Sequence, residues 1–173
     1  LLGMVVGLDP LSIDTVLPAT QVMVEGLETD FSSIQLSLSL FVLGMAVGQL
    51  FHGPASDRFG RRPVMLAALG FYVVATVVLA LAPGIDTLIV ARLVQGFAAA
   101  ASQTVSRAII RDRLDREAAS QVLSYVLLVL AIAPVVAPIL GAYLTESVGW
   151  RSVFWVMIIY GVLVILLHGR WLE

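Results

Sequence analysis

Hydrophobic positions in this chain form long uninterrupted runs instead of the alternating pattern of a soluble protein. Residues 31–56, 63–85, 118–145 and 152–169 contain no charged side chain. Two more runs are apolar but interrupted, 1–24 by Asp9 and Asp14 and 87–106 by Arg92. A helix needs about 20 apolar residues to cross a bilayer. The pattern therefore predicts six transmembrane helices, near residues 1–24, 32–54, 64–83, 86–108, 119–144 and 152–170.

Composition supports a membrane protein. Only 13% of the 173 residues are charged, 60% are hydrophobic and the mean hydropathy is +1.00, whereas a soluble domain carries about 25% charged residues. The predicted fold class is an all-α bundle of six helices over residues 1–173, with loops too short for a soluble domain. The apolar start has neither a basic segment nor a cleavage site, so it does not resemble a signal peptide. Because the chain also lacks an initiator Met, we expect it to be cut inside or just before the first helix.

The arginines predict the orientation of the bundle, because cytoplasmic loops retain positive charge. All ten basic residues are Arg, and the loops on the opposite side are acidic apart from Arg151. Eight of the ten fall on one side of the predicted membrane: Arg58, Arg61, Arg62, Arg107, Arg111, Arg113, Arg116 and Arg170. We therefore expect both termini to be cytoplasmic.

Several function classes are disfavoured by what the sequence lacks. A net charge of −2 gives no electrostatic footprint for nucleic acid. There are no cysteines, and the two histidines, His52 and His168, are too few and too far apart in sequence for a metal cluster. An intramembrane hydrolase needs a nucleophile with a base, or paired acids, and His52 adjoins no serine nucleophile signature. We therefore expect neither an enzyme nor a cofactor.

Polar residues inside a membrane are costly and usually face the bundle interior or a water-filled path. Asp14 lies near the predicted midplane, where Pro18 should loosen the helix, and Asp9 lies nearer the inner surface. Asp14 is a candidate protonatable or substrate-contacting group. The alternative is a buried carboxylate that is permanently paired with an arginine.

Arg92 begins a polar stripe along the fourth helix. Spacings of three and four place small and polar residues on one face: Arg92, Gly96, Ala99, Gln103 and Ser106. Together with Gln95, this stripe favours a cavity wall. Arg92 could instead extend its charge to the membrane surface, and the small residues could serve only helix packing.

Glycines, prolines and aromatic residues add structural expectations. In the second helix, Gly44 and Gly48 form a small-xxx-small pair that predicts close packing. In the fifth helix, Pro134, Pro138 and Gly141 indicate either a bending element or a passive kink. Aromatic residues at the two ends of the sixth helix predict anchors at the membrane surfaces: Trp150, Phe154, Trp155 and Trp171.

The stretch HGPASDRFGRRP, residues 52–63, crowds four charges into six positions. It resembles the signature of the loop between helices 2 and 3 in the major facilitator superfamily, and every key position is filled: Gly53, Asp57, Arg58, Gly60, Arg61 and Arg62. RLVQGFAAA resembles the helix 4 motif, and Asp14 with Pro18 resembles the helix 1 motif of drug:proton antiporters. SRAIIRD, LAIAPVVAPILGAYL and GWRSVFW narrow the resemblance to the Bcr/CflA multidrug efflux group of bacteria.

The resemblance implies proton-coupled efflux of small, amphipathic molecules by alternating access across the bacterial inner membrane, driven by the proton gradient. Asp14, Arg92, Gln95 and Gln103 would form the proton and substrate pathway. The Asp57 loop would act as a cytoplasmic gate, although its arginines could instead serve only to fix the orientation in the membrane. Helix 5 would bend at Pro134, Pro138 and Gly141.

The family fold has two six-helix halves, so the resemblance implies that a carboxy-terminal half is missing. We expect residues 1–173 not to transport alone. Two alternatives stay open: a metabolite importer of the same superfamily, and a membrane scaffold that transports nothing.

Overall fold

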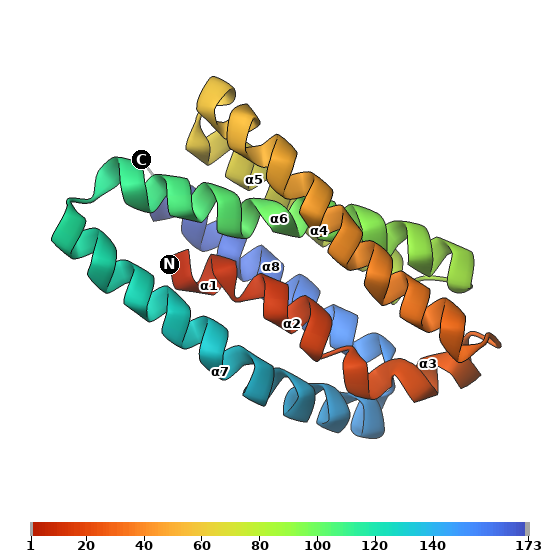
Figure 1. The fold of residues 1–173 in the computed structure, drawn as a ribbon. Coiled ribbons are helices and arrows are strands. Elements are labelled where there is room, and N and C mark those ends of the chain that lie inside the picture. Colours follow the sequence, from red (N-terminus) through yellow and green to blue (C-terminus); the bar gives the residue numbers. More distant parts are fainter. Residues whose placement is uncertain (1, 172–173) are drawn as a thin grey trace.

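The computed structural model describes residues 2–171 and consists of helices that lie side by side in one bundle (Figure 1). Six helical segments of this described part are long and apolar enough to cross a membrane: Leu2–Gly26, Phe31–Phe59, Arg61–Ala80, Ile85–Arg113, Arg116–Val148 and Arg151–Gly169. The predicted fold class is therefore confirmed. The predictions for Trp171 as a membrane anchor and for Arg170 as a cytoplasmic charge concern side chains that lie outside the described part of the structure, as does Leu1.

The first span is not the continuous helix predicted over 1–24. It is divided into α1 (Leu2–Val6), α2 (Leu8–Asp14), the 3₁₀ turn η1 (Leu17–Ala19) and α3 (Thr20–Gly26). Pro18 explains the break after α2, because it has no amide hydrogen to donate to the carbonyl of Asp14. The loosening expected at Pro18 is thus present. Between α1 and α2, Gly7 keeps α-helical dihedral angles (φ −64°, ψ −15°), and its amide donates to the carbonyl of Gly3 at 3.0 Å.

The other spans are single helices: α4 (Phe31–Phe59), α5 (Arg61–Ala80), α6 (Ile85–Arg113), α7 (Arg116–Val148) and α8 (Arg151–Trp171). The carboxylates of Asp30 and Asp115 accept backbone hydrogen bonds at the starts of α4 and α7, at 3.0 and 2.8 Å, which fixes where these helices begin. Gly60 and Gly149 adopt φ of +92° and +99°, in the region that favours glycine, and turn the chain between helices.

The boundary near residue 54 differs from the prediction. Residues 55–59, expected in a loop, continue α4 as a helix through Pro54, and only Gly60 separates α4 from α5. Beyond the membrane the charged side chains of this turn can reach water while the backbone stays helical. The charge pattern therefore marks the end of the apolar span but not the end of the helix.

Glycines allow α4 and α6 to pack backbone against backbone. A β-carbon on Gly44 or Gly48 would overlap the carbonyls of Leu93 and Phe97, and one on Gly96 would overlap the carbonyl of Phe41. Packing of this kind is typical of small residues in membrane helices. The close packing predicted for Gly44 and Gly48 is confirmed.

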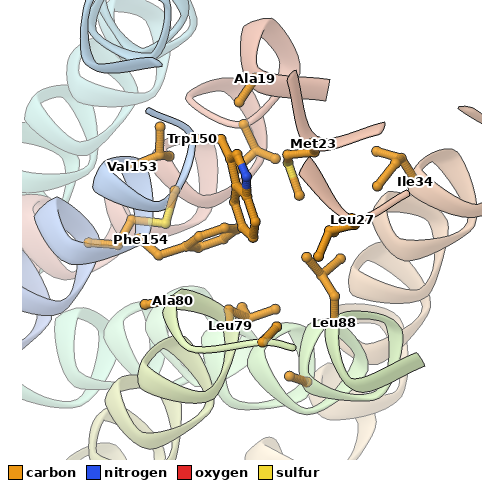
Figure 2. Close-up of a cluster of buried hydrophobic side chains, with 14 of the residues drawn as sticks. Ala19, Met23, Leu27, Ile34, Leu79, Ala80, Leu88, Trp150, Val153 and Phe154 are labelled. Atoms are coloured by element: carbon orange, nitrogen blue, oxygen red, sulfur yellow. The ribbon is translucent and has the colours of Figure 1, made fainter. Parts of the chain in front are cut away.

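Trp150, Phe154 and Trp155, at or just before the start of α8, were predicted to form a membrane-surface belt, but the first two lie in the core, which corrects that prediction. Trp150 is buried among Met23, Leu27 and Leu88, and its ring meets that of Phe154 edge to face with centroids 6.0 Å apart (Figure 2). Their apolar rings fill the space where α3, α5, α6 and α8 converge. Of the three residues, only Trp155 is exposed.

Candidate functional site

Arg92 is the largest fully buried side chain among the described residues. Its Nη1 donates to the backbone carbonyl of Ser12 and to Oε1 of Gln95, both at 2.9 Å. Its guanidinium lies 5.6 Å from the ring centroid of Phe41 and 5.1 Å from that of Phe154. No carboxylate of residues 2–169 lies within 4.0 Å of it. Neutral acceptors and aromatic faces therefore surround this charge.

A chain of hydrogen bonds extends from Arg92 to α5 and α2. Gln95 Nε2 donates to Thr76 Oγ1 at 2.9 Å, and Thr76 Oγ1 donates to the carbonyl of Tyr72 at 2.6 Å. The hydroxyls of Tyr72 and Ser12 lie 2.6 Å apart. The network joins the first, third and fourth spans. Its polar members on α5 could have been noticed as two hydroxyls four residues apart in an apolar run.

Asp14 and Gln103, the other two predicted pathway residues, do not join this network. Asp14 ends α2, is partly exposed, and lies within 4.0 Å of no arginine nitrogen among the described side chains. Gln103 is also partly exposed, and its Oε1 accepts from Nη2 of Arg107 at 3.1 Å. Asp14 therefore forms no permanent pair with an arginine among the described side chains.

Asp9 is the carboxylate of the first span that is enclosed. Its side chain is only 2% exposed, and Oδ1 accepts from Ser102 Oγ at 2.8 Å. The second oxygen, Oδ2, has no hydrogen-bond partner in the described part of the chain. The sequence placed Asp9 nearer the inner surface and gave it no role. Asp9 is enclosed and Asp14 is not because α2 packs Asp9 against Ser102 of α6, more than 90 residues away in sequence, and the sequence alone does not reveal this contact.

The ends of α4, α5 and α6 meet at what we call the arginine-rich end, which comprises residues 57–62 and 107–116. Arg61 Nη1 lies 2.5 Å from Asp57, and Nη2 lies 2.9 Å from Asp112 of α6. Nη1 also donates to Ser56 Oγ at 2.6 Å. Arg62 Nη2 donates to the carbonyl of Gly169 at 2.8 Å, which ties α5 to α8.

The other residues of the predicted gate have different surroundings. The guanidinium of Arg58 lies 5.4 Å from the ring centroid of Phe59, Gly53 lies within α4, and Gly60 forms the turn. Asp57 has 64% of its side chain exposed and contacts Arg61 of its own half.

The fifth span, α7, stays helical through Pro134 and Pro138. Gly141 packs against the backbone of Thr15, so closely that a β-carbon would overlap its carbonyl. Gly141 therefore brings α7 against the broken part of the first span. Whether α7 bends during function stays a prediction.

Comparisons with known proteins identify the family of this chain. Residues 2–173 match the Major Facilitator Superfamily. The MFS-type transporter YdgK of Bacillus subtilis is 39% identical over 169 residues, 96% of this chain and 42% of that protein. A bicyclomycin resistance protein homolog of Haemophilus influenzae is 35% identical, over 94% of this chain and 41% of that protein. The multidrug resistance protein MdtL of Escherichia coli is 34% identical, over 91% and 40%.

A solved structure agrees on the fold. The human organic anion transporter MFSD10 superposes with a TM-score of 0.78 at 19% identity, over 99% of this chain and 46% of that one. The chain thus spans less than half the length of the proteins it matches, as a six-helix half does. These relatives are transporters and not enzymes. This chain belongs to the Major Facilitator Superfamily.

Proposed function

We propose that the protein exports small amphipathic molecules in exchange for protons by alternating access. The names of two relatives, which refer to bicyclomycin resistance and multidrug resistance, support efflux over import. Because the chain spans about 40% of these relatives, the proposal concerns transport by the whole protein, with a second half completing the site.

One observation carries the proposal: in the described part of the chain, neither Arg92 nor Asp14 forms an ion pair. Arg92 is fully buried against neutral acceptors, whereas Asp14 is partly exposed at the break of the first span. Unpaired ionisable groups within a membrane span usually mark a substrate or proton pathway. A partly exposed carboxylate can exchange a proton with water or contact a cationic substrate, and Arg92 holds the adjacent carbonyl of Ser12.

The arginine-rich end would face the cytoplasm, in line with the positive-inside rule. There Arg61 binds acids of both α4 and α6, so its contacts can hold the two helix ends together in one conformation and release them in another. Asp57, largely exposed beside Arg61, remains accessible to a neighbouring half. We propose this cluster as the gate.

Everted vesicles containing the complete product of the gene test the proposal. A resistance substrate added under a proton gradient should release protons from the vesicles, and Asp14→Asn or Arg92→Ala should abolish this release. Glu117→Gln, on an exposed position of α7, is the matched control and should transport normally.

Three outcomes would contradict the proposal. Full proton release by both Asp14→Asn and Arg92→Ala would remove these two residues from the pathway. No proton release by the unmutated protein would favour the scaffold alternative. Substrate uptake into cells, with no drug sensitivity after deletion of the gene, would favour a metabolite importer.

A further inference from the structure

We propose that Asp9 is a second proton-binding site of this half, and that its protonation controls the contact between α2 and α6. The proposal rests on the proton-coupled transport proposed above but concerns a different residue and a different face of the first span. It assigns a role to the enclosed carboxylate, whereas the sequence pattern pointed to Asp14.

The first argument is burial without charge compensation. Asp9 is 2% exposed, its Oδ2 has no partner, and no basic nitrogen of the described side chains lies within 4.0 Å of the carboxylate. An ionised carboxylate in such a position is strongly disfavoured unless it is paired. A proton on Oδ2 removes the charge and leaves Oδ1 bonded to the Ser102 hydroxyl.

The groups around Asp9 come from each neighbouring helix. On α6 they are Ser102, Gln103 and the exposed Arg107, and on α5 the hydroxyl of Tyr72. On α8, the Tyr160 hydroxyl is engaged elsewhere, because it donates to the carbonyl of Met4 at 2.8 Å. The titratable side chains of α7 all lie at exposed positions. Arg107 is thus the one cation among these neighbours, and it reaches solvent.

Polar side chains on α6 mark a route from the arginine-rich end to Asp9. Arg107 contacts Gln103, and Ser106 lies one turn from Ser102 with a buried hydroxyl that has no partner in the described chain. Gln103 is partly exposed and Arg107 is exposed, so these polar groups link the solvent to the surroundings of Asp9, and a proton can reach Oδ2 along them. The step is a simple addition: the carboxylate and one proton give the carboxylic acid, and release reverses it.

Protonation at Asp9 has a direct mechanical consequence for α2. The bond from Ser102 is charge-assisted while Asp9 is ionised and becomes a weaker, neutral bond when Asp9 is protonated. Three residues further along the same short helix, Ser12 accepts from Arg92 and contacts Tyr72. Because the helix of the first span is broken after α2, at Pro18, this end of α2 can shift on α6. A proton on Asp9 would therefore change the position of the carbonyl that Arg92 holds.

Infrared spectroscopy of the complete protein in lipid tests the assignment without substrate or transport. A protonated carboxyl group in nonpolar surroundings gives a high-frequency carbonyl stretch, and we expect one such band to titrate with pH. Asp9→Asn should remove this band. Asp14→Asn, five residues away on the same segment and partly exposed, should leave it in place.

Ser102→Ala keeps the carboxyl group and removes its donor, so it should move the band to higher frequency. This second variant decides the matter where Asp9→Asn fails to fold. A band that persists in Asp9→Asn, or does not move in Ser102→Ala, overturns the proposal. Proton release measured on the same samples separates the two proposals: a normal Asp9 band without substrate-dependent proton release contradicts transport but not the proton site.

Discussion

The contact between α4 and α6 yields the sharpest prediction about stability, because it depends on a missing side chain. Gly96 lies four residues after Arg92 and rests on the backbone of Phe41, whose ring flanks the Arg92 guanidinium. An alanine at this position would place its β-carbon inside the Phe41 carbonyl. The atoms it meets belong to a helix backbone, which cannot move aside as a side chain does.

The size of the effect follows from two opposing contributions. Overpacking a well-packed contact costs about 1–3 kcal/mol, and we expect the upper end, about 3 kcal/mol, because α4 must move as a whole. Alanine favours the helix over glycine by about 1 kcal/mol. Gly96→Ala should therefore lose about 2 kcal/mol of stability.

Gly70→Ala is the matched control for this prediction. Gly70 lies within α5, and a β-carbon there meets nothing within 4 Å. Only the helix preference remains, so Gly70→Ala should gain up to about 1 kcal/mol. Tryptophan fluorescence during thermal unfolding in detergent gives both melting temperatures. A Gly96→Ala protein as stable as Gly70→Ala would refute the proposed backbone contact.

Two further predictions concern the ends of α4. Ser33 donates to the Asp30 carboxylate from its backbone and its hydroxyl, and these bonds hold the pKa of Asp30 below its ordinary value. The stability that the ionised carboxylate contributes is therefore present at neutral pH and is lost as pH falls through the lowered pKa. Asp30→Asn still caps the helix but has no carboxylate to titrate. Melting curves of this variant should therefore lack the pH dependence. Arg61→Gln should lower the free energy of unfolding by about 1 kcal/mol, within the range for partly exposed ion pairs. The control Arg58→Gln should leave the melting temperature unchanged. Equal melting temperatures of the two variants would contradict the role of Arg61.

Hydropathy was sufficient to predict the number of spans, because a bilayer imposes the same length and polarity on every crossing helix. It could not locate the end of α4. Ser56, Asp57 and Arg58 are polar where the chain leaves the membrane, and polarity does not distinguish a helical turn from a loop. Likewise, the position of Trp150 in the sequence was correct for a surface anchor, yet the packing of four helices around it placed it in the core.

The polar network was only half predictable. Arg92 and Gln95 are three residues apart on one helix, so their contact follows from helical spacing. Thr76, Tyr72 and Ser12 contribute from other helices, and no periodicity in a single sequence indicates which hydroxyl meets which. The glycine pair of α4 was more informative, because small residues at a four-residue spacing predict close approach whatever the partner.

The position of a carboxylate around the helix decides whether it is enclosed or exposed, as the two carboxylates of the first span show. Asp9 and Asp14 are five residues apart, and at about 100° per residue their side chains point roughly 140° apart around α2. One helix cannot bury both against the same neighbour. Asp9 faces Ser102 of α6 and is enclosed, so Asp14 is directed away and stays partly exposed. The two faces of this seven-residue segment therefore differ in exposure, and we propose different tasks for them: Asp9 would hold a proton inside the half, and Asp14 would offer a charge where a second half closes the site.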